Sequence, residues 1–94
     1  MLTWNVTYHC KQGQREAFYQ ALCALGIRDN SRAEAGNLRY DYFFAAEAPD
    51  DLLLVESWTC PECQKAHCET ALFARLQEIK AQYCTGVEIE KFSV

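Results

Sequence analysis

The sequence has little positive charge, and what it has is scattered. Its 94 residues include nine lysines and arginines against thirteen aspartates and glutamates, which gives a formal net charge of −4 at pH 7. No basic run or stripe is present, so we expect no binding to nucleic acid, because such binding relies on neutralising phosphates with lysine and arginine. A chain of this length is expected to form one domain over residues 1–94.

Long apolar runs are also missing. No stretch approaches the roughly 20 apolar residues that a membrane-spanning helix requires. The N-terminal segment MLTWNVTYHC alternates between polar and apolar residues and lacks the basic start and apolar centre of a secretory signal peptide. We therefore expect a cytoplasmic protein with no membrane association. In that reducing compartment the six cysteines are expected to remain thiols.

The residues that are present follow two hydrophobic periods. Alternating apolar residues, typical of a half-buried strand, predict strands over residues 2–10, 37–45, 52–58 and 87–92. Apolar residues at helical spacing predict helices over residues 14–25 and 71–83, and a helical pattern also begins near Cys60. A capping box formed by Ser31 and Glu34 predicts a further short helix that Gly36 ends.

The order of the main elements, β-α-β-β-α-β, is the split βαβ arrangement of ferredoxin-like α+β proteins. It predicts a four-stranded antiparallel sheet with helices on one face. The other face must meet water or a second sheet, and both faces of the predicted strands carry large residues. Hydrophobic residues make up 50% of the chain. We therefore expect a homodimer that forms through the sheet face.

The segment TCPECQKAHC, residues 59–68, holds three cysteines and a histidine within ten residues. A redox dithiol of the thioredoxin type is disfavoured, because neither Pro49 nor Pro61 lies downstream of the CxxC pair, where that fold places a cis-proline loop. A zinc site formed by Cys60, Cys63 and His67 is also disfavoured, because the chain offers no second pair of ligands.

The segment is explained most simply as the start of a helix. Thr59 and Glu62 form a capping box, and Pro61 occupies the first turn, where its missing N–H group is not needed. The later cysteines are then expected to pack as small apolar residues. Cys60 lies near the helix N-terminus, where the pKa of a thiol can fall, so it is a candidate reactive thiol.

Three short motifs in a fixed order resemble the antibiotic biosynthesis monooxygenase (ABM) family, and in particular its small quinol monooxygenase members. They are EAGNLRYD at residues 34–41, VESW at residues 55–58 and the pair Ala66-His67, nine residues after the tryptophan. The resemblance covers nearly the whole chain, from the opening strand with Asn5 to the closing segment GVEIEKF. It implies a dimeric ferredoxin-like α+β barrel, the architecture that the hydrophobic pattern predicts independently.

The resemblance also implies an activity. Monooxygenases of this family use no metal, flavin or haem; a dihydroxy-aromatic substrate loses a proton, and the electron-rich anion then reduces O₂. The protein supplies an apolar cavity, orientation and a proton acceptor. The sequence agrees in lacking a glycine-rich nucleotide loop and a convincing metal cluster. We therefore expect a cofactor-independent monooxygenase that acts on a quinol or related polyphenol with O₂.

Alternatives within and beyond this family stay open. The run GNLRYD is also very similar to a branch that processes phosphorylated autoinducer-2, an isomerase or lyase type of enzyme that uses no O₂. A haem-degrading branch fits Asn5 but is disfavoured, because residues 71–83 contain no histidine. A dimeric ligand-binding module that has kept the fold without the activity is the third alternative.

His67 and Glu56 are the predicted catalytic, proton-handling pair. An imidazole exchanges protons near neutral pH, and a carboxylate in mid-strand needs a partner, either His67 or, as an ordinary ion pair, Arg39. The predicted substrate-binding residues are Asn5, Trp58, Arg39 and Tyr40. Trp58 offers a flat apolar wall to an aromatic substrate, and Arg39 suits an anionic group. No metal ligands are predicted.

Overall fold

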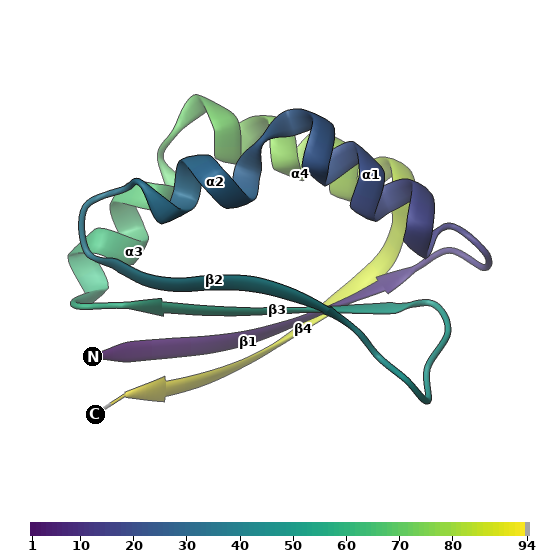
Figure 1. Ribbon diagram of the computed structural model, residues 1–94, viewed down its shortest axis with the longest axis horizontal. Helices are drawn as coiled ribbons and strands as arrows, with labels where there is room; N and C mark the ends of the chain where they lie inside the picture. Colours follow the sequence, from purple (N-terminus) through teal and green to yellow (C-terminus); the bar gives the residue numbers. More distant parts are fainter. Residues whose placement is uncertain (94) are drawn as a thin grey trace.

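The computed structural model describes residues 1–93, which form one antiparallel sheet with helices on one of its faces (Figure 1). Four strands lie in the order β2-β3-β1-β4. The elements in chain order are β1 (Leu2–Cys10), α1 (Arg15–Leu25), α2 (Ile27–Arg32), β2 (Asn37–Phe44), β3 (Asp51–Trp58), α3 (Pro61–Cys68), α4 (Ala71–Tyr83) and β4 (Cys84–Ser93). No helix within residues 1–93 is long and apolar enough to cross a membrane.

The predicted α+β ferredoxin-like architecture is confirmed, with two helices rather than one in each crossover. The helix predicted over residues 71–83 has those bounds, and α1 ends at Gly26, as expected. Gly26 takes a positive φ of 77°, which an L side chain rarely adopts, and this turn lets α2 begin at the next residue.

Both predicted capping boxes are wrong. Ser31 does not begin a helix, because α2 already starts at Ile27 and places Ser31 in its last turn, where the side chain is buried. The residue before α3 is Cys60, in an extended conformation, and the hydroxyl of Thr59 lies 3.6 Å from the sulfur of Cys63. The burial of Ser31 and the contact of Thr59 with Cys63 decide the local conformation, and the Ser/Thr-x-x-Glu spacing does not.

Strand alternation decides which side chains the helices cover. In β1, the side chains of Trp4, Val6 and Tyr8 face the helices, and those of the residues between them face away. The register places Glu56 of β3 between Trp4 of β1 and Tyr40 of β2, in one row on the covered face. This row lies below α3 and α4 and becomes one wall of the candidate site.

The core is the layer between the sheet and the helices. Phe18 and Leu22 of α1 and Leu76 of α4 are almost fully buried against Leu54 and Trp58 of β3. Burying a side chain of this size contributes roughly 1.5–3 kcal/mol to stability. The opposite face of the sheet has no helix over it (Figure 1) and carries exposed aromatic residues, among them Phe43 and Phe92.

Candidate functional site

His67 lies on α3 with only 2% of its surface exposed. Its Nδ1 atom is 2.6 Å from Oε1 of Glu34, which belongs to the turn between α2 and β2. A backbone hydrogen bond between the two segments holds them together. The N–H of Thr59 donates to the carbonyl of Gly36 at 2.8 Å, and α3 begins two residues later at Pro61. The short loop after β3 therefore sets α3, and with it His67, against the turn that carries Glu34.

This contact selects the tautomer of the neutral imidazole. A carboxylate accepts hydrogen bonds and does not donate them, so Nδ1 of His67 carries a hydrogen, and in the neutral ring Nε2 then has the free lone pair. Nε2 is buried and has no hydrogen-bond partner within residues 1–93. A buried polar atom without a partner is costly, and such atoms are rare in folded proteins. An oriented imidazole with a free Nε2 is the arrangement that a general base requires.

Aromatic side chains surround the imidazole. Its ring centroid lies 5.0 Å from that of Trp58, 5.3 Å from that of Phe73 and 5.6 Å from that of Tyr40. Thr70 caps α4 by accepting from the backbone N–H of Phe73 at 3.1 Å, which fixes the start of the helix that brings Phe73 to the site. The surroundings of Nε2 are therefore apolar.

Glu56 is buried in the middle of β3, with 5% of its surface exposed. The indole N–H of Trp58 donates to its Oε1 atom at 2.9 Å, since residues two apart on a strand share a face. Burial raises the pKa of Glu56 above its ordinary value, while the hydrogen bond from Trp58 and, whenever its imidazole is protonated, nearby His67 act in the opposite direction. Glu56 is therefore held toward its protonated form and can exchange a proton.

Two hollows meet these side chains from different sides. A cavity of about 70 Å³ lies between the sheet and α3 and α4. It is lined by Trp4, Val6, Tyr8, Glu56, Gln64, Cys68, Phe73, Gln77, Lys80, Val87 and Ile89. A shallow groove of about 370 Å³ lies outside α3 and is lined by Glu34, Ala35, Glu62, Cys63, Ala66, His67 and Thr70. Glu56 borders the cavity, His67 borders the groove, and Trp58 contacts both residues.

The predicted site residues fall into two groups. His67, Glu56, Trp58 and Tyr40 lie together on the helix-covered face. Asn5 pairs with Val55, and Arg39 pairs with Ser57. Val55 and Ser57 are the neighbours of Glu56 along β3, so their pairs lie on the opposite, open face of the sheet. The alternative ion pair between Arg39 and Glu56 is wrong, because Arg39 donates to Asp41 at 2.8 Å on that open face.

Sequence reasoning missed the partner of His67. Glu34 is the first residue of the EAGNLRYD motif, and its place in that motif was the only sign in the sequence that it could belong to the site. Its contact with His67 spans 33 residues of chain, so no local spacing reveals it.

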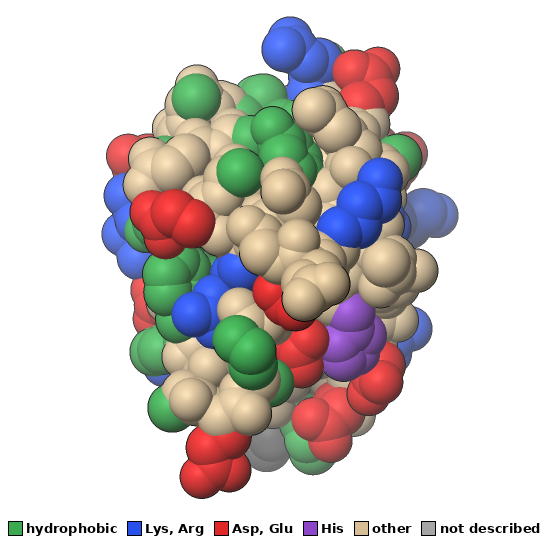
Figure 2. Space-filling model, turned by 90° about the vertical axis from the view of Figure 1, so that its right-hand side faces the viewer, with side chains coloured by type: hydrophobic (Ala, Val, Ile, Leu, Met, Phe, Trp, Pro, Cys, Tyr) green, Lys and Arg blue, Asp and Glu red, His purple; other side chains and the backbone are tan. Residues whose placement is uncertain are grey.

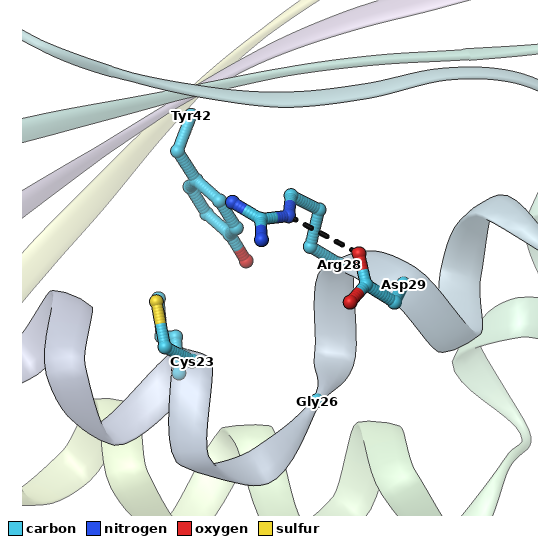
Figure 3. A pocket seen from close by; sticks show the side chains of 6 residues that line it. Cys23, Gly26, Arg28, Asp29 and Tyr42 are labelled. Carbon is cyan, nitrogen blue, oxygen red and sulfur yellow. Dashed lines mark hydrogen bonds and ion pairs between the residues drawn. The ribbon is translucent and has the colours of Figure 1, made fainter.

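Two other features are not part of this site. The second histidine, His9, lies between Asp51 at 2.7 Å and Glu88 at 3.0 Å, and Figure 2 shows a histidine side chain beside acidic ones on that end of the molecule. A cavity of about 20 Å³ lies where the α1–α2 turn meets Tyr42 of β2 (Figure 3). A volume of that size holds about one water molecule and no substrate.

Comparison with known proteins gives a consistent result. The family model described as antibiotic biosynthesis monooxygenase matches residues 1–79. A solved structure from Nitrosomonas europaea, provisionally named an antibiotic biosynthesis monooxygenase, is 24% identical with a TM-score of 0.90, covering 100% of this chain and 98% of that chain. PA3566 from Pseudomonas aeruginosa is 28% identical with a TM-score of 0.87, covering 99% of this chain and 92% of that chain. No curated protein matches the chain.

The buried carboxyl group of Glu56 makes stability depend on pH. Because its pKa is higher in the folded protein than in the unfolded chain, its contribution is fully present below the unfolded pKa and is lost as pH rises through the folded pKa. The Glu56→Gln variant keeps an oxygen for Trp58 but cannot ionise. As pH rises, we expect the free energy of unfolding of this variant to increase relative to that of the wild type. The increase is about 1.4 kcal/mol for each unit by which folding raises the pKa of Glu56.

Urea unfolding between pH 4 and pH 8 measures this difference. Glu78→Gln, at an exposed position on α4, serves as the matched control and should show no such trend. If the free energy of unfolding of Glu56→Gln instead falls relative to that of the wild type as pH rises, the placement of Glu56 is contradicted, because the folded protein then favours the carboxylate.

Proposed function

The chain belongs to the antibiotic biosynthesis monooxygenase family, and from that premise we propose that it oxidises a quinol or related polyphenol with O₂. The proposed reaction uses no metal, flavin or haem, because the electron-rich substrate anion itself reduces O₂. One oxygen atom enters the substrate and the other leaves as water, and the substrate supplies the two electrons.

The observation that carries this proposal is the free Nε2 atom of His67. The atom is buried among aromatic rings, and the contact of Nδ1 with Glu34 leaves Nε2 as the nitrogen at which the neutral imidazole accepts a proton. Removing a phenolic proton from a quinol produces the anion from which electrons pass to O₂. General bases of this kind typically contribute a factor of about 10² to 10⁴ in rate.

Glu56 and Trp58 take supporting roles in the proposal. The raised pKa of Glu56 suits a group that returns a proton to the reduced oxygen species. Trp58 joins the two proton-handling residues, since its ring packs on His67 and its N–H donates to Glu56. Tyr40, also against His67, completes the aromatic surroundings that favour a flat substrate.

The isomerase or lyase alternative uses the same base without O₂. It requires a cation to hold a phosphate group, and Arg39, the predicted candidate, lies on the other face of the sheet in an ion pair with Asp41. Lys80 is the cation that borders the cavity. The placement of Arg39 counts against this alternative, because Lys80 is then the only cation among the described residues that line the cavity. A ligand-binding module without activity is the third candidate.

Oxygen uptake with a panel of quinols tests the proposal. We expect uptake by the wild type and at least a tenfold loss in His67→Gln, because the glutamine cannot act as a base at neutral pH. His9→Gln is the matched control, since it removes the other histidine and leaves the site untouched. Equal uptake by His67→Gln and the wild type would contradict the role of His67. No uptake by the wild type with any quinol would contradict the proposed reaction for this substrate class.

The proposal includes a homodimer that forms through the open sheet face. That face carries Phe43 and Phe92, both about half exposed, and sheets with such faces pack against each other at about 10 Å. Asn5 and Arg39 then belong to the interface rather than to the pocket around His67.

Light scattering coupled to size-exclusion chromatography tests the dimer. We expect a mass twice that of one chain for the wild type and a shift toward the monomer for Val55→Glu, which places a charge at the centre of the open face. Ala24→Lys, at an exposed position on α1, is the control and should stay dimeric. A monomeric wild type, or a Val55→Glu variant that stays dimeric, would contradict a sheet-to-sheet interface.

A further inference from the structure

Two free thiols meet at the start of α3. The sulfur atoms of Cys60 and Cys63 are 2.8 Å apart, and neither is part of a disulfide. A disulfide bond requires about 2.05 Å between the sulfurs, so the pair needs to close by less than about 1 Å. Both residues are partly exposed, which leaves them open to a small oxidant.

The surroundings activate Cys63 rather than Cys60. The sulfur of Cys63 contacts both the thiol of Cys60 and the hydroxyl of Thr59, and these two groups hold the pKa of Cys63 below its ordinary value. The same contact with Cys63 raises the pKa of Cys60. The sequence pattern pointed to Cys60 as the reactive thiol, and the structure corrects that assignment. The thiolate is the reactive form of cysteine, and a position near a helix N-terminus favours it.

Gly36 leaves the space that the side chain of Cys63 occupies. It has a φ of 80°, and a β carbon added there would clash with the sulfur of Cys63 and lie 2.7 Å from the hydroxyl of Thr59. The thiol therefore packs directly on the backbone of the turn that carries Glu34. Cys63 also lines the groove beside His67.

The other four cysteines do not form such an accessible pair, and among them Cys23 is an exposed thiol on α1. Cys10 and Cys84 pair across β1 and β4, but burial raises the pKa of both thiols, that of Cys84 to about 12. Burial also raises the pKa of Cys68. Within residues 1–93 no group of three or more His, Cys, Asp or Glu side chains could hold a metal ion.

We propose that Cys60 and Cys63 form a redox-active dithiol that hydrogen peroxide oxidises to a disulfide. The thiolate of Cys63 attacks one peroxide oxygen, which breaks the O–O bond and gives a sulfenic acid and, after protonation of the leaving hydroxide, water. The sulfur of Cys60 then attacks the sulfur of Cys63 and displaces hydroxide, which leaves as a second water with the proton of Cys60. Two thiols and one peroxide thus give one disulfide and two waters.

The disulfide is reversible in the presence of a small thiol. Two glutathione thiols reduce it by exchange through a mixed disulfide, and they leave as glutathione disulfide. This inference does not rest on the proposed monooxygenase activity, because it uses neither His67 nor a quinol.

Mass spectrometry tests the proposal directly. After treatment with hydrogen peroxide, blocking of free thiols with N-ethylmaleimide and digestion with trypsin, the peptide of residues 40–65 contains Cys60 and Cys63 and no other cysteine. We expect that peptide to be two hydrogens lighter and free of maleimide, and to regain both thiols after glutathione treatment. A peptide that still carries two maleimide groups, while other cysteines are oxidised, would overturn the proposal.

Two variants separate the roles of the cysteines. Cys60→Ser should leave a sulfenic acid on Cys63 that dimedone labels, and Cys63→Ser should slow peroxide consumption at least tenfold. The double variant Cys10→Ser/Cys84→Ser is the control and should oxidise like the wild type. Equal rates for Cys63→Ser and the wild type would overturn the assignment of Cys63 as the nucleophile, and the wild-type peptide measurement stands even if a variant fails to fold.

Discussion

The hydrogen bond between Nδ1 of His67 and the carboxylate of Glu34 is the interaction on which the candidate site depends. It joins α3 to the turn before β2 and selects the tautomer of the imidazole. The Nε2 atom is then left among Trp58, Tyr40 and Phe73, where no side chain of the described residues 1–93 forms a hydrogen bond with it. The three aromatic rings position the imidazole by packing, and the contact with Glu34 decides which of its nitrogens carries the hydrogen.

The one-sided arrangement of helices on the sheet determines the rest of the site. Because residues along a strand alternate between faces, the row Trp4–Glu56–Tyr40 is covered by helices, and the neighbouring row with Asn5 and Arg39 is not. The covered row buries a carboxyl group and raises its pKa, which the indole N–H of Trp58 only partly offsets. The uncovered row provides the surface that we assign to a second copy of the chain.

Local pattern predicts the elements of this protein well and its contacts poorly. The alternation of residues 2–10 and the helical spacing of residues 71–83 are strong periodic signals, and both elements form with those bounds. The two capping boxes rest on four residues each, and the burial of Ser31 and the contacts of Thr59 with Gly36 and Cys63 override them. The motif positions of His67 and Glu56 bring both to one region, but the partnership of His67 with Glu34 and the meeting of Cys60 with Cys63 depend on the folded loops.

The central claim is that Glu34 holds the hydrogen of His67 on Nδ1 and leaves Nε2 free. Long-range ¹H–¹⁵N NMR correlation of the imidazole ring tests this claim directly, because the ¹⁵N shifts distinguish a nitrogen that carries hydrogen from one with a free lone pair. We expect the hydrogen on Nδ1 and a free Nε2 in the wild type at neutral pH. A spectrum with the hydrogen on Nε2 would contradict it, since His67 would then have no acceptor to offer a substrate proton.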